Sequence, residues 1–423
     1  MNALFSKKIF SLLLFTFFSV NLIASYLLIP MDEDQKDHLK SYGIAYWLLQ
    51  EKLEVDWLLN YRGGSFAVKN LKQIEKECKI RGVSYEVIAD ARYTAILSLI
   101  ANPEKNMDLA KLEKEPKIAV YSPKSKLPWD DAVTMALTYA KIPYEIVYDE
   151  EVLEHKLVEY DWLHLHHEDF TGQYGKFYKS YRNASWYKHQ QQETETRANK
   201  YGFDKASKMK LKVAQNIRDF VAGGGFMFAM CSATDSYDIA LAAEKTDICA
   251  AMFDGDAAHS HAQAALDFTK TFAFKDFKLR VNPLEYEYSN IDANFGRKVP
   301  KNLDYFTLFD FSAKWDPVPT MLTQCHTRAV KGFMGQTTAF RKSVIKSDVL
   351  ILGQNNAYNE ARYIHGVFGN GMWSWYGGHD PEDYQHFVGD PKTDLSLHPN
   401  SPGYRLILNN VLFPAARKKE RKT

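Results

Sequence analysis

The sequence contains few cysteines, and their spacing matches neither a zinc site nor a disulfide framework. Four cysteines occur in 423 residues, and no CxxC pair is among them. A chain of this length buries enough apolar surface to fold without cross-links. The missing CxxC pairs also argue against a structural zinc ion. The sequence leaves open one disulfide among Cys78, Cys231, Cys249 and Cys325.

The sequence also lacks an excess of positive or negative charge. The chain has 53 Lys and Arg against 52 Asp and Glu, which gives a net charge of +1 at pH 7. Proteins that bind the nucleic-acid backbone usually carry a basic surplus, so we expect no nucleic-acid partner. The charged and hydrophobic fractions, 25% and 46%, are those of an ordinary soluble globular protein.

Long apolar runs are absent after the first two dozen residues. Lys7 and Lys8 precede an apolar run at 9–24, which ends in the small residues Ala24 and Ser25. This pattern predicts a signal peptide over 1–25, cleaved before Ser25 or Tyr26. The run is short for a membrane span, although an uncleaved N-terminal anchor is the alternative. We therefore expect an exported protein, periplasmic or extracellular, with no membrane span after signal removal.

Residues 26–115 are expected to form a small N-terminal α/β unit. Strand-like runs at 26–31, 55–61 and 83–88 alternate with helical segments, which predicts a β-α-β-α-β order. Such alternation favours a parallel sheet. The glycine pair after the second strand reads as a turn, and the charged stretch at 102–115 reads as a linker.

The main core is expected over 116–245 and 330–416, followed by a basic tail at 417–423. Its strands are predicted at 117–121, 144–148, 161–166 and 226–230, with amphipathic helices at 208–221 and 402–413. The fold class is therefore α/β, with a doubly wound and mostly parallel sheet. The polar, aromatic segment from 170 to about 207 reads as an inserted helix or lid. Short strand-like pieces at 246–329 predict a β-rich insertion.

One stretch, FVAGGGFMFAMCSATDSYDIALAA at 220–243, has the pattern of a catalytic elbow. An apolar strand ends directly at Cys231, small residues flank the cysteine, and a helix follows. α/β enzymes place a nucleophile on such a turn. The helix N-terminus offers N–H groups that lower a thiol pKa and stabilise an oxyanion. The alternative is a buried, inert cysteine at a strand end.

From Lys117 to Phe413 the chain resembles the class I glutamine amidotransferase-like superfamily, which has a flavodoxin-like fold. The resemblance rests on the elbow, on the later YGGHDPED and on the closing helix RLILNNVLF. It implies that Cys231 is the nucleophile and His379 the base, with Glu382 or Asp380 orienting the imidazole. The family's elbow is usually Gly-x-Cys-x-Gly, whereas alanines flank the cysteine here.

An oxyanion site is expected beside the cysteine. The amide of Ser232 would supply one N–H, and the loop after the third core strand would supply another. That loop carries His166, His167, Glu168 and Asp169 at the carboxyl end of its strand, where α/β sheets bind ligands. These residues predict an amide or ester hydrolase, or an amidase-type enzyme, that acts on a small envelope or extracellular substrate.

The whole chain also resembles exported bacterial proteins commonly labelled asparagine synthetase B. Asparagine synthetase itself begins Met-Cys and carries the pyrophosphate loop Ser-Gly-Gly-x-Asp-Ser. This chain begins Met1-Asn2, and its nearest match to the loop, 232–236, lacks both glycines that allow close phosphate approach. We therefore expect no ATP and no other cofactor.

Two further functions are considered. His164 and His166 alternate onto one strand face, with Glu168 in phase, and such a set could serve a metal-dependent hydrolase. Alternatively, the tyrosine-rich segment at 170–187 could form a glycan or peptide site beside an inert Cys231.

The signal peptide generates the first testable prediction. The mature chain should begin at Ser25 or Tyr26, because the small residues at the end of the apolar run suit signal peptidase. N-terminal sequencing of the protein secreted by its native host measures this directly. A cytoplasmic protein that starts at Met1 would contradict the prediction.

Overall fold

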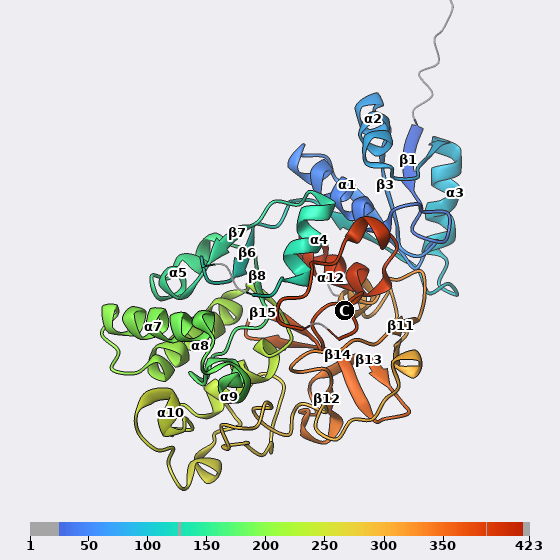
Figure 1. The fold of residues 1–423 in the computed structure, drawn as a ribbon. Helices are drawn as coiled ribbons and strands as arrows, with labels where there is room; N and C mark the ends of the chain where they lie inside the picture. The colour runs from blue at the N-terminus through green and yellow to red at the C-terminus, as the bar shows by residue number, and fades with distance from the viewer. Residues whose placement is uncertain (1–24, 126–127, 386, 418–423) are drawn as a thin grey trace, which may run out of the picture.

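The computed structural model describes residues 25–125, 128–385 and 387–417. They form a mixed α/β fold with two sheets, one of five strands and one of ten (Figure 1). The predicted signal peptide, apart from Ser25, and most of the basic tail lie outside the described residues. No helix in the described ranges is both long and apolar enough to cross a membrane.

The N-terminal unit is an antiparallel sheet with the order β4-β1-β3-β2-β5. The succession β1-α1-β2-β3-α2-β4 with this strand order is a ferredoxin-like arrangement, to which α3 and β5 are added. Its elements are β1 (Ser25–Ile29), α1 (His38–Gln50), β2 (Val55–Leu59), β3 (Ser65–Lys69), α2 (Lys72–Arg81), β4 (Glu86–Ala89), α3 (Asp90–Ala101) and β5 (Asp108–Leu112).

The prediction of a parallel N-terminal sheet was wrong because of one turn. Arg62, Gly63 and Gly64 all have positive φ, so the chain reverses at once and β3 returns beside β2 as a hairpin. Because of this extra strand, the later strands of the unit pair antiparallel to their neighbours instead of parallel. The predicted linker at 102–115 also contains a strand, since β5 pairs with β2 through the register Val55↔Leu112 to Leu59↔Asp108.

The large sheet has the order β11-β10-β13-β14-β15-β9-β8-β6-β7, and β12 pairs with β14. Only β15, β9, β8, β6 and β7 pair in parallel, so the prediction of a mostly parallel sheet holds for one half of it. The strands are β6 (Ile118–Tyr121), β7 (Glu145–Val147), β8 (Trp162–Leu165), β9 (Phe226–Met230), β10 (Tyr305–Leu308), β11 (Ala329–Lys331), β12 (Phe340–Arg341), β13 (Leu350–Asn355), β14 (Glu360–Phe368) and β15 (Gly371–Tyr376).

Helices cover both faces of the parallel half, and alternate residues of each strand face opposite cores. On β9, Phe226, Phe228 and Met230 join a core with α1, α4 and α12, whereas Met227 and Ala229 face α8 and α9. The helices are α4 (Ala132–Ala140), α5 (Asp149–Leu153), α6 (Tyr178–Tyr181), α7 (Ser185–Lys200), α8 (Ala206–Gly223), α9 (Ala233–Ala242), α10 (Ala251–Asp254), α11 (Pro317–Leu322) and α12 (Pro402–Leu412).

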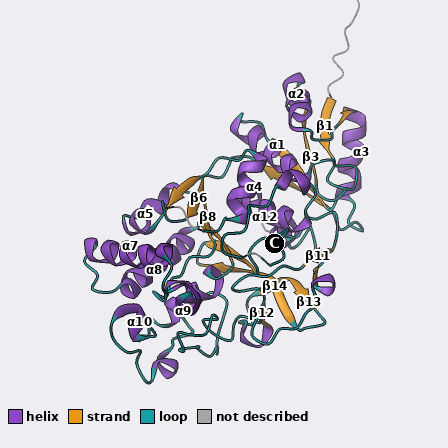
Figure 2. Ribbon diagram, in the orientation of Figure 1, coloured by secondary structure: helices purple, strands orange, loops and turns teal. Residues whose placement is uncertain are grey.

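The four predicted core strands and the two amphipathic helices are confirmed to within a few residues. The segment at 170–207 is largely helical, as the inserted-helix prediction required. The predicted β-rich insertion at 246–329 is wrong, because its one strand before Ala329 is β10 and Figure 2 shows the rest mainly as loop. Side chains, instead of a neighbouring strand, accept some of the main-chain N–H groups of this region. The Asp238 carboxylate, for example, accepts the N–H groups of three consecutive residues, 272–274, at 2.6–2.9 Å.

The N-terminal unit shares its core with the main domain. Helix α1 lies against α4 and α12 (Figure 1), and one continuous cluster of buried side chains runs through both units. The buried Arg405 of α12 binds the carbonyl oxygens of Met31 and Gly63 and the Tyr42 hydroxyl. Its charge therefore holds three segments of the N-terminal unit on the closing helix.

The α1–α4 contact generates a stability prediction. A Cβ at Gly43 would lie 1.8 Å from the carbonyl oxygen of Ala140, so Gly43→Ala forces the helices apart. The free energy of unfolding should fall by about 1–3 kcal/mol, the usual cost of overpacking. Gly223→Ala is the matched control, because a Cβ there has no neighbour within 4 Å. Chemical denaturation measures both variants, and equal effects would contradict the close contact.

Candidate active site

The parallel pairing of β9 with β15 brings two distant parts of the chain together. Met230 lies opposite Tyr376 at the carboxyl ends of these strands, so the residues that follow each strand leave the sheet side by side. The Cys231 N–H donates to the carbonyl oxygen of Gly378 at 3.1 Å. Cys231 and His379 therefore meet at this edge of the sheet, as the predicted order of motifs required.

The turn at Cys231 has the geometry of a nucleophile elbow. Cys231 has a φ of +52°, in the left-handed region that non-glycine residues rarely adopt. Its carbonyl oxygen accepts both the main-chain N–H and the hydroxyl of Thr234 in the first turn of α9. These bonds hold the strained residue at the start of the helix, with its side chain directed away from the sheet.

Cys231, His379 and Asp130 form a connected chain of side chains. The His379 imidazole interacts with both neighbours: its Nε2 lies 3.9 Å from Asp130 Oδ1, an ion-pair distance, and it shifts the pKa of the Cys231 thiol. All three residues are at least nine-tenths buried, since their exposed fractions are 4%, 6% and 7%. This is the nucleophile–base–acid arrangement of a thiol enzyme.

Burial and the neighbouring polar groups shift the pKa values of Cys231 and His379 in opposite directions, and the neighbouring groups have the larger effect. Burial alone would raise the pKa of Cys231, but the hydrogen bond and charge of His379 bring it below its usual value. Burial would likewise lower the pKa of His379, yet Asp130 and Cys231 raise it to about 10. Both shifts favour a thiolate beside an imidazolium over the neutral thiol and imidazole.

Main-chain N–H groups complete the surroundings of the sulfur. The amides of Gln336 and Ser232 both hydrogen-bond to the Cys231 side chain and favour its charged form. The Ser232 amide is the one that the sequence analysis predicted, and the second amide beside the sulfur comes from Gln336. Two main-chain N–H groups beside a nucleophile could stabilise the oxyanion of an acyl transfer reaction.

The predicted loop residues mainly organise the site. The Asp169 carboxylate accepts the N–H and hydroxyl of Thr171 and the N–H of Gly175. Glu168 accepts the Tyr148 hydroxyl at 3.1 Å, and burial raises its pKa to about 7. These contacts shape the chain around the site without reaching the sulfur.

Glu382 and Asp380 do not take the role predicted for them. Glu382 forms an ion pair with His398 at 3.2 Å. Asp380 accepts the hydroxyls of Thr393 and Tyr404 and two main-chain N–H groups, so it braces the loop that carries His379. The acid nearest the imidazole is Asp130, which is not among the site residues predicted from the sequence. Its position along the chain could have indicated this role, because Asp130 follows β6 and β6 ends at the same edge of the sheet.

The remaining histidines lie around the same point. His164 bonds the Phe228 carbonyl oxygen and Asp131 through its two ring nitrogens, which is the pattern of an interior hydrogen-bonded residue. His166 Nδ1 lies 3.0 Å from the same Asp131 oxygen. His166, His167 and His379 each offer a ring nitrogen, and these nitrogens lie within 4.8 Å of one another, close enough to share a cation.

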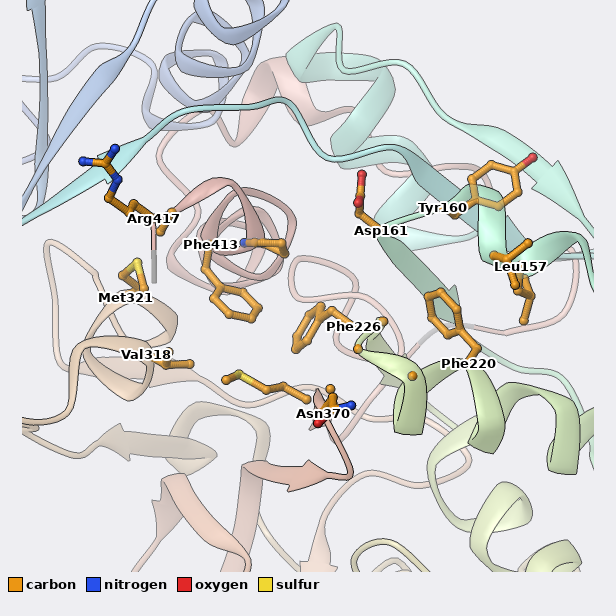
Figure 3. A pocket seen from close by; sticks show the side chains of 18 of the residues that line it. Leu157, Tyr160, Asp161, Phe220, Phe226, Val318, Met321, Asn370, Phe413 and Arg417 are labelled. Atoms are coloured by element: carbon orange, nitrogen blue, oxygen red, sulfur yellow. The ribbon is translucent and has the colours of Figure 1, made fainter. Parts of the chain in front are cut away.

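A separate apolar cavity of about 790 Å³ lies at the opposite edge of the sheet (Figure 3). It is lined at the amino ends of the parallel strands, where Phe226 opens β9 and Met372 follows the first residue of β15. Figure 3 shows the rings of Phe226 and Phe413 together in it, and their centroids are 4.5 Å apart. Cys231 follows the other end of β9, so this cavity is not part of the site.

Comparison with known proteins gives no functional assignment. No protein-family model matches the chain, and no curated protein matches it. Among solved structures, it is similar to "Cytoplasmic Protein STM3548 from Salmonella typhimurium", with 10% identity, a TM-score of 0.33 and coverage of 71% of this chain and 100% of that chain. It is also similar to "Cytoplasmic Protein STM1381 from Salmonella typhimurium LT2", with 12% identity, a TM-score of 0.36 and the same coverage. Likeness at this level supports no statement about function.

The state of the thiol is directly testable. Iodoacetamide at pH 7 should label Cys231 before Cys78, Cys249 and Cys325, because alkylation needs a thiolate and burial raises the pKa of the other three thiols. Access alone would favour Cys325, which is the most exposed of the four free cysteines. Peptide mapping by mass spectrometry measures the rates.

The His379→Ala variant is the control for this experiment. Without the imidazolium, the largest influences that lower the pKa of Cys231 are lost, so its labelling should slow at pH 7 and rise at higher pH. Equal labelling of all four cysteines in the wild-type protein would contradict a thiolate at Cys231.

Proposed function

We propose that the chain is an exported thiol hydrolase, built on an amidotransferase-like core, that cleaves an amide or ester of a small envelope or extracellular molecule. The observation that carries this proposal is the buried group of Cys231, His379 and Asp130, with Cys231 on a strained strand-to-helix turn. A purely structural cysteine has no need for an imidazolium partner or for a left-handed backbone.

The proposed reaction begins with the thiolate. Cys231 attacks the carbonyl carbon of the bound amide or ester, and the main-chain N–H groups of Ser232 and Gln336 lie beside the oxyanion that forms. The His379 imidazolium gives its proton to the leaving amine or alcohol as the bond to carbon breaks, which leaves a thioester. Neutral His379 then takes a proton from water, whose oxygen attacks the thioester and releases the acid. Thiolate and imidazolium are thereby restored.

Asp130 has a positioning role in this reaction. Its carboxylate, 3.9 Å from His379 Nε2, orients the ring and stabilises the imidazolium between the two proton transfers. Asp131, the next residue, caps α4 through the Thr134 N–H at 2.8 Å and binds His164 and His166. The two neighbouring acids therefore serve different histidines from one helix start.

Metal-dependent hydrolysis is the second candidate. The observation that favours it is the approach of His166, His167 and His379 to within 4.8 Å, a donor set that suits zinc with an open position. The predicted pair of His164 and His166 is less suitable, because both ring nitrogens of His164 already bond to protein groups. A metal at the three-histidine cluster would occupy the ring that the thiol mechanism uses as base.

The two candidates are separated by hydrolysis of p-nitrophenyl acetate and of a panel of p-nitroanilides. Cys231→Ala should abolish turnover, and Asp130→Asn should lower it by about 10²–10⁴-fold, the range seen when general acid–base catalysis is lost. Glu382→Gln is the matched control and should stay near wild type, because Glu382 pairs with His398.

The same assay tests the metal. Dialysis against EDTA should leave the rate unchanged, and elemental analysis should find no stoichiometric zinc. Activity that survives in Cys231→Ala but is lost with EDTA would replace the thiol mechanism with the metal mechanism. No activity in any variant, together with an unreactive Cys231, would leave a ligand-binding protein.

A further inference from the structure

Two buried carboxyls beside the elbow have no role in the proposed reaction. Asp235 lies in the first turn of α9, and Asp292 comes from the irregular region at 246–329. Each is 1% exposed, and one oxygen of each, Oδ2, accepts no hydrogen bond from the described residues. An unpaired buried carboxylate oxygen is costly, so such atoms in a native protein indicate a missing partner.

The segment at 335–340 connects these carboxyls to the sulfur. Thr337 donates its hydroxyl to Asp235 at 3.0 Å, and the main-chain N–H of the preceding residue, Gln336, bonds to Cys231. Asp292 forms a β-bridge with Phe340 at the end of the same segment. Both acids are thus held next to the nucleophile by a few residues of one loop.

Aromatic side chains stand on the same side of the site. The Gln336 side-chain amide donates to the carbonyl oxygen of Tyr286, whose side chain is 44% exposed. The hydroxyl of Tyr288 is buried and accepts and donates no hydrogen bond within the described residues. The Tyr286 ring is 6.0 Å from that of Phe177, which packs on Trp129, and Trp129 in turn contacts His167. An aromatic wall, exposed at Tyr286 and buried at Phe177, therefore leads from the surface to His167, which lies beside His379.

Within the part of the chain that the structure describes, no Lys or Arg forms an ion pair with either acid. Burial raises the pKa of Asp235 to about 7, and the neighbouring Asp169 acts in the same direction. Burial raises the pKa of Asp292 as well, and Asp235 and Glu287 add to the effect. Lys176, the nearby buried amine, donates instead to the carbonyl oxygens of Arg280 and Asn282.

We propose that Asp235 and Asp292, with the aromatic wall formed by Tyr286, Phe177 and Trp129, bind a positively charged nitrogen of the substrate. This inference rests on the proposed thiol hydrolase and names its substrate class, an amide or ester that carries an ammonium or guanidinium group near the scissile bond. The two carboxylates supply charge-assisted hydrogen bonds, and the aromatic faces attract a cation on its way in. Asp235 belongs to the helix that starts at the nucleophile, so the cation and the reacting carbonyl are held by one rigid element.

Charged thiol reagents of similar size test this inference without knowledge of the substrate. The thiolate displaces methanesulfinate from 2-aminoethyl methanethiosulfonate, which is cationic, or from 2-sulfonatoethyl methanethiosulfonate, which is anionic. At pH 8, the cationic reagent should modify Cys231 faster by roughly tenfold or more, the ratio expected from one charge-assisted hydrogen bond. Methyl methanethiosulfonate provides the neutral reference rate, and Cys325 provides an internal reference thiol.

Substitution of the acids should remove this preference. Asp235→Asn and Asp292→Asn should each reduce the ratio of cationic to anionic rates severalfold. Asp219→Asn is the matched control, because this exposed acid lies near the C-terminus of α8, at the opposite edge of the sheet. A cationic preference that persists unchanged in both acid variants would overturn the assignment of the site to these residues.

A second measurement needs only the wild-type protein and therefore does not depend on whether the variants fold. n-Butylammonium should protect Cys231 from iodoacetamide, whereas n-butanol and butyrate at the same concentration should not. Equal protection by all three, or a Cys231 that reacts fast with no preference for charge, would overturn the cation site while leaving the thiol hydrolase standing. A Cys231 no more reactive than the other cysteines would instead overturn the proposed function itself.

Discussion

The parallel alignment of β9 with β15 is the constraint on which the site depends. The register that places Met230 opposite Tyr376 sets the two strand ends level, and the bond from the Cys231 N–H to the Gly378 carbonyl locks the following turns together. A slip of one residue would turn every side chain of the strand to the other face. Because that register also buries alternate residues in two different cores, the packing of the whole sheet protects the meeting of Cys231 and His379.

The N-terminal unit is coupled to this site through one helix. Asp130 and Asp131 stand at the start of α4, and α4 packs on α1 at the close approach of Gly43 to Ala140. The position of Asp130 beside His379 thus depends on a contact with a unit that supplies none of the residues of the candidate site. This gives the ferredoxin-like unit a structural purpose, since it covers α4 and α12 and is tied to them by the buried Arg405.

Much of the regular structure was predictable because local patterns decide it. The core strands, the helices α8 and α12 and the elbow at Cys231 follow from apolar runs, amphipathic spacing and the small residues around the cysteine. The direction of the N-terminal strands was not predictable, because a single tight turn after β2 determines whether the next strand folds back beside β2. The region at 246–329 has strand-like composition, but its aromatic side chains pack on α9 and the sheet while acids such as Asp238 satisfy its backbone.

The sequence by itself located Cys231, its turn and His379, the candidate nucleophile and base, because each follows a recognisable strand and their order along the chain is informative. It could not select the acid, because Glu382 is close to His379 in sequence whereas Asp130 is close to it only in space. The tertiary structure likewise decided that Gln336 provides an amide to the sulfur and that Asp235 and Asp292 face the same loop. These choices depend on contacts between segments far apart along the chain, whose energies come from burial and from paired charges that local patterns do not encode.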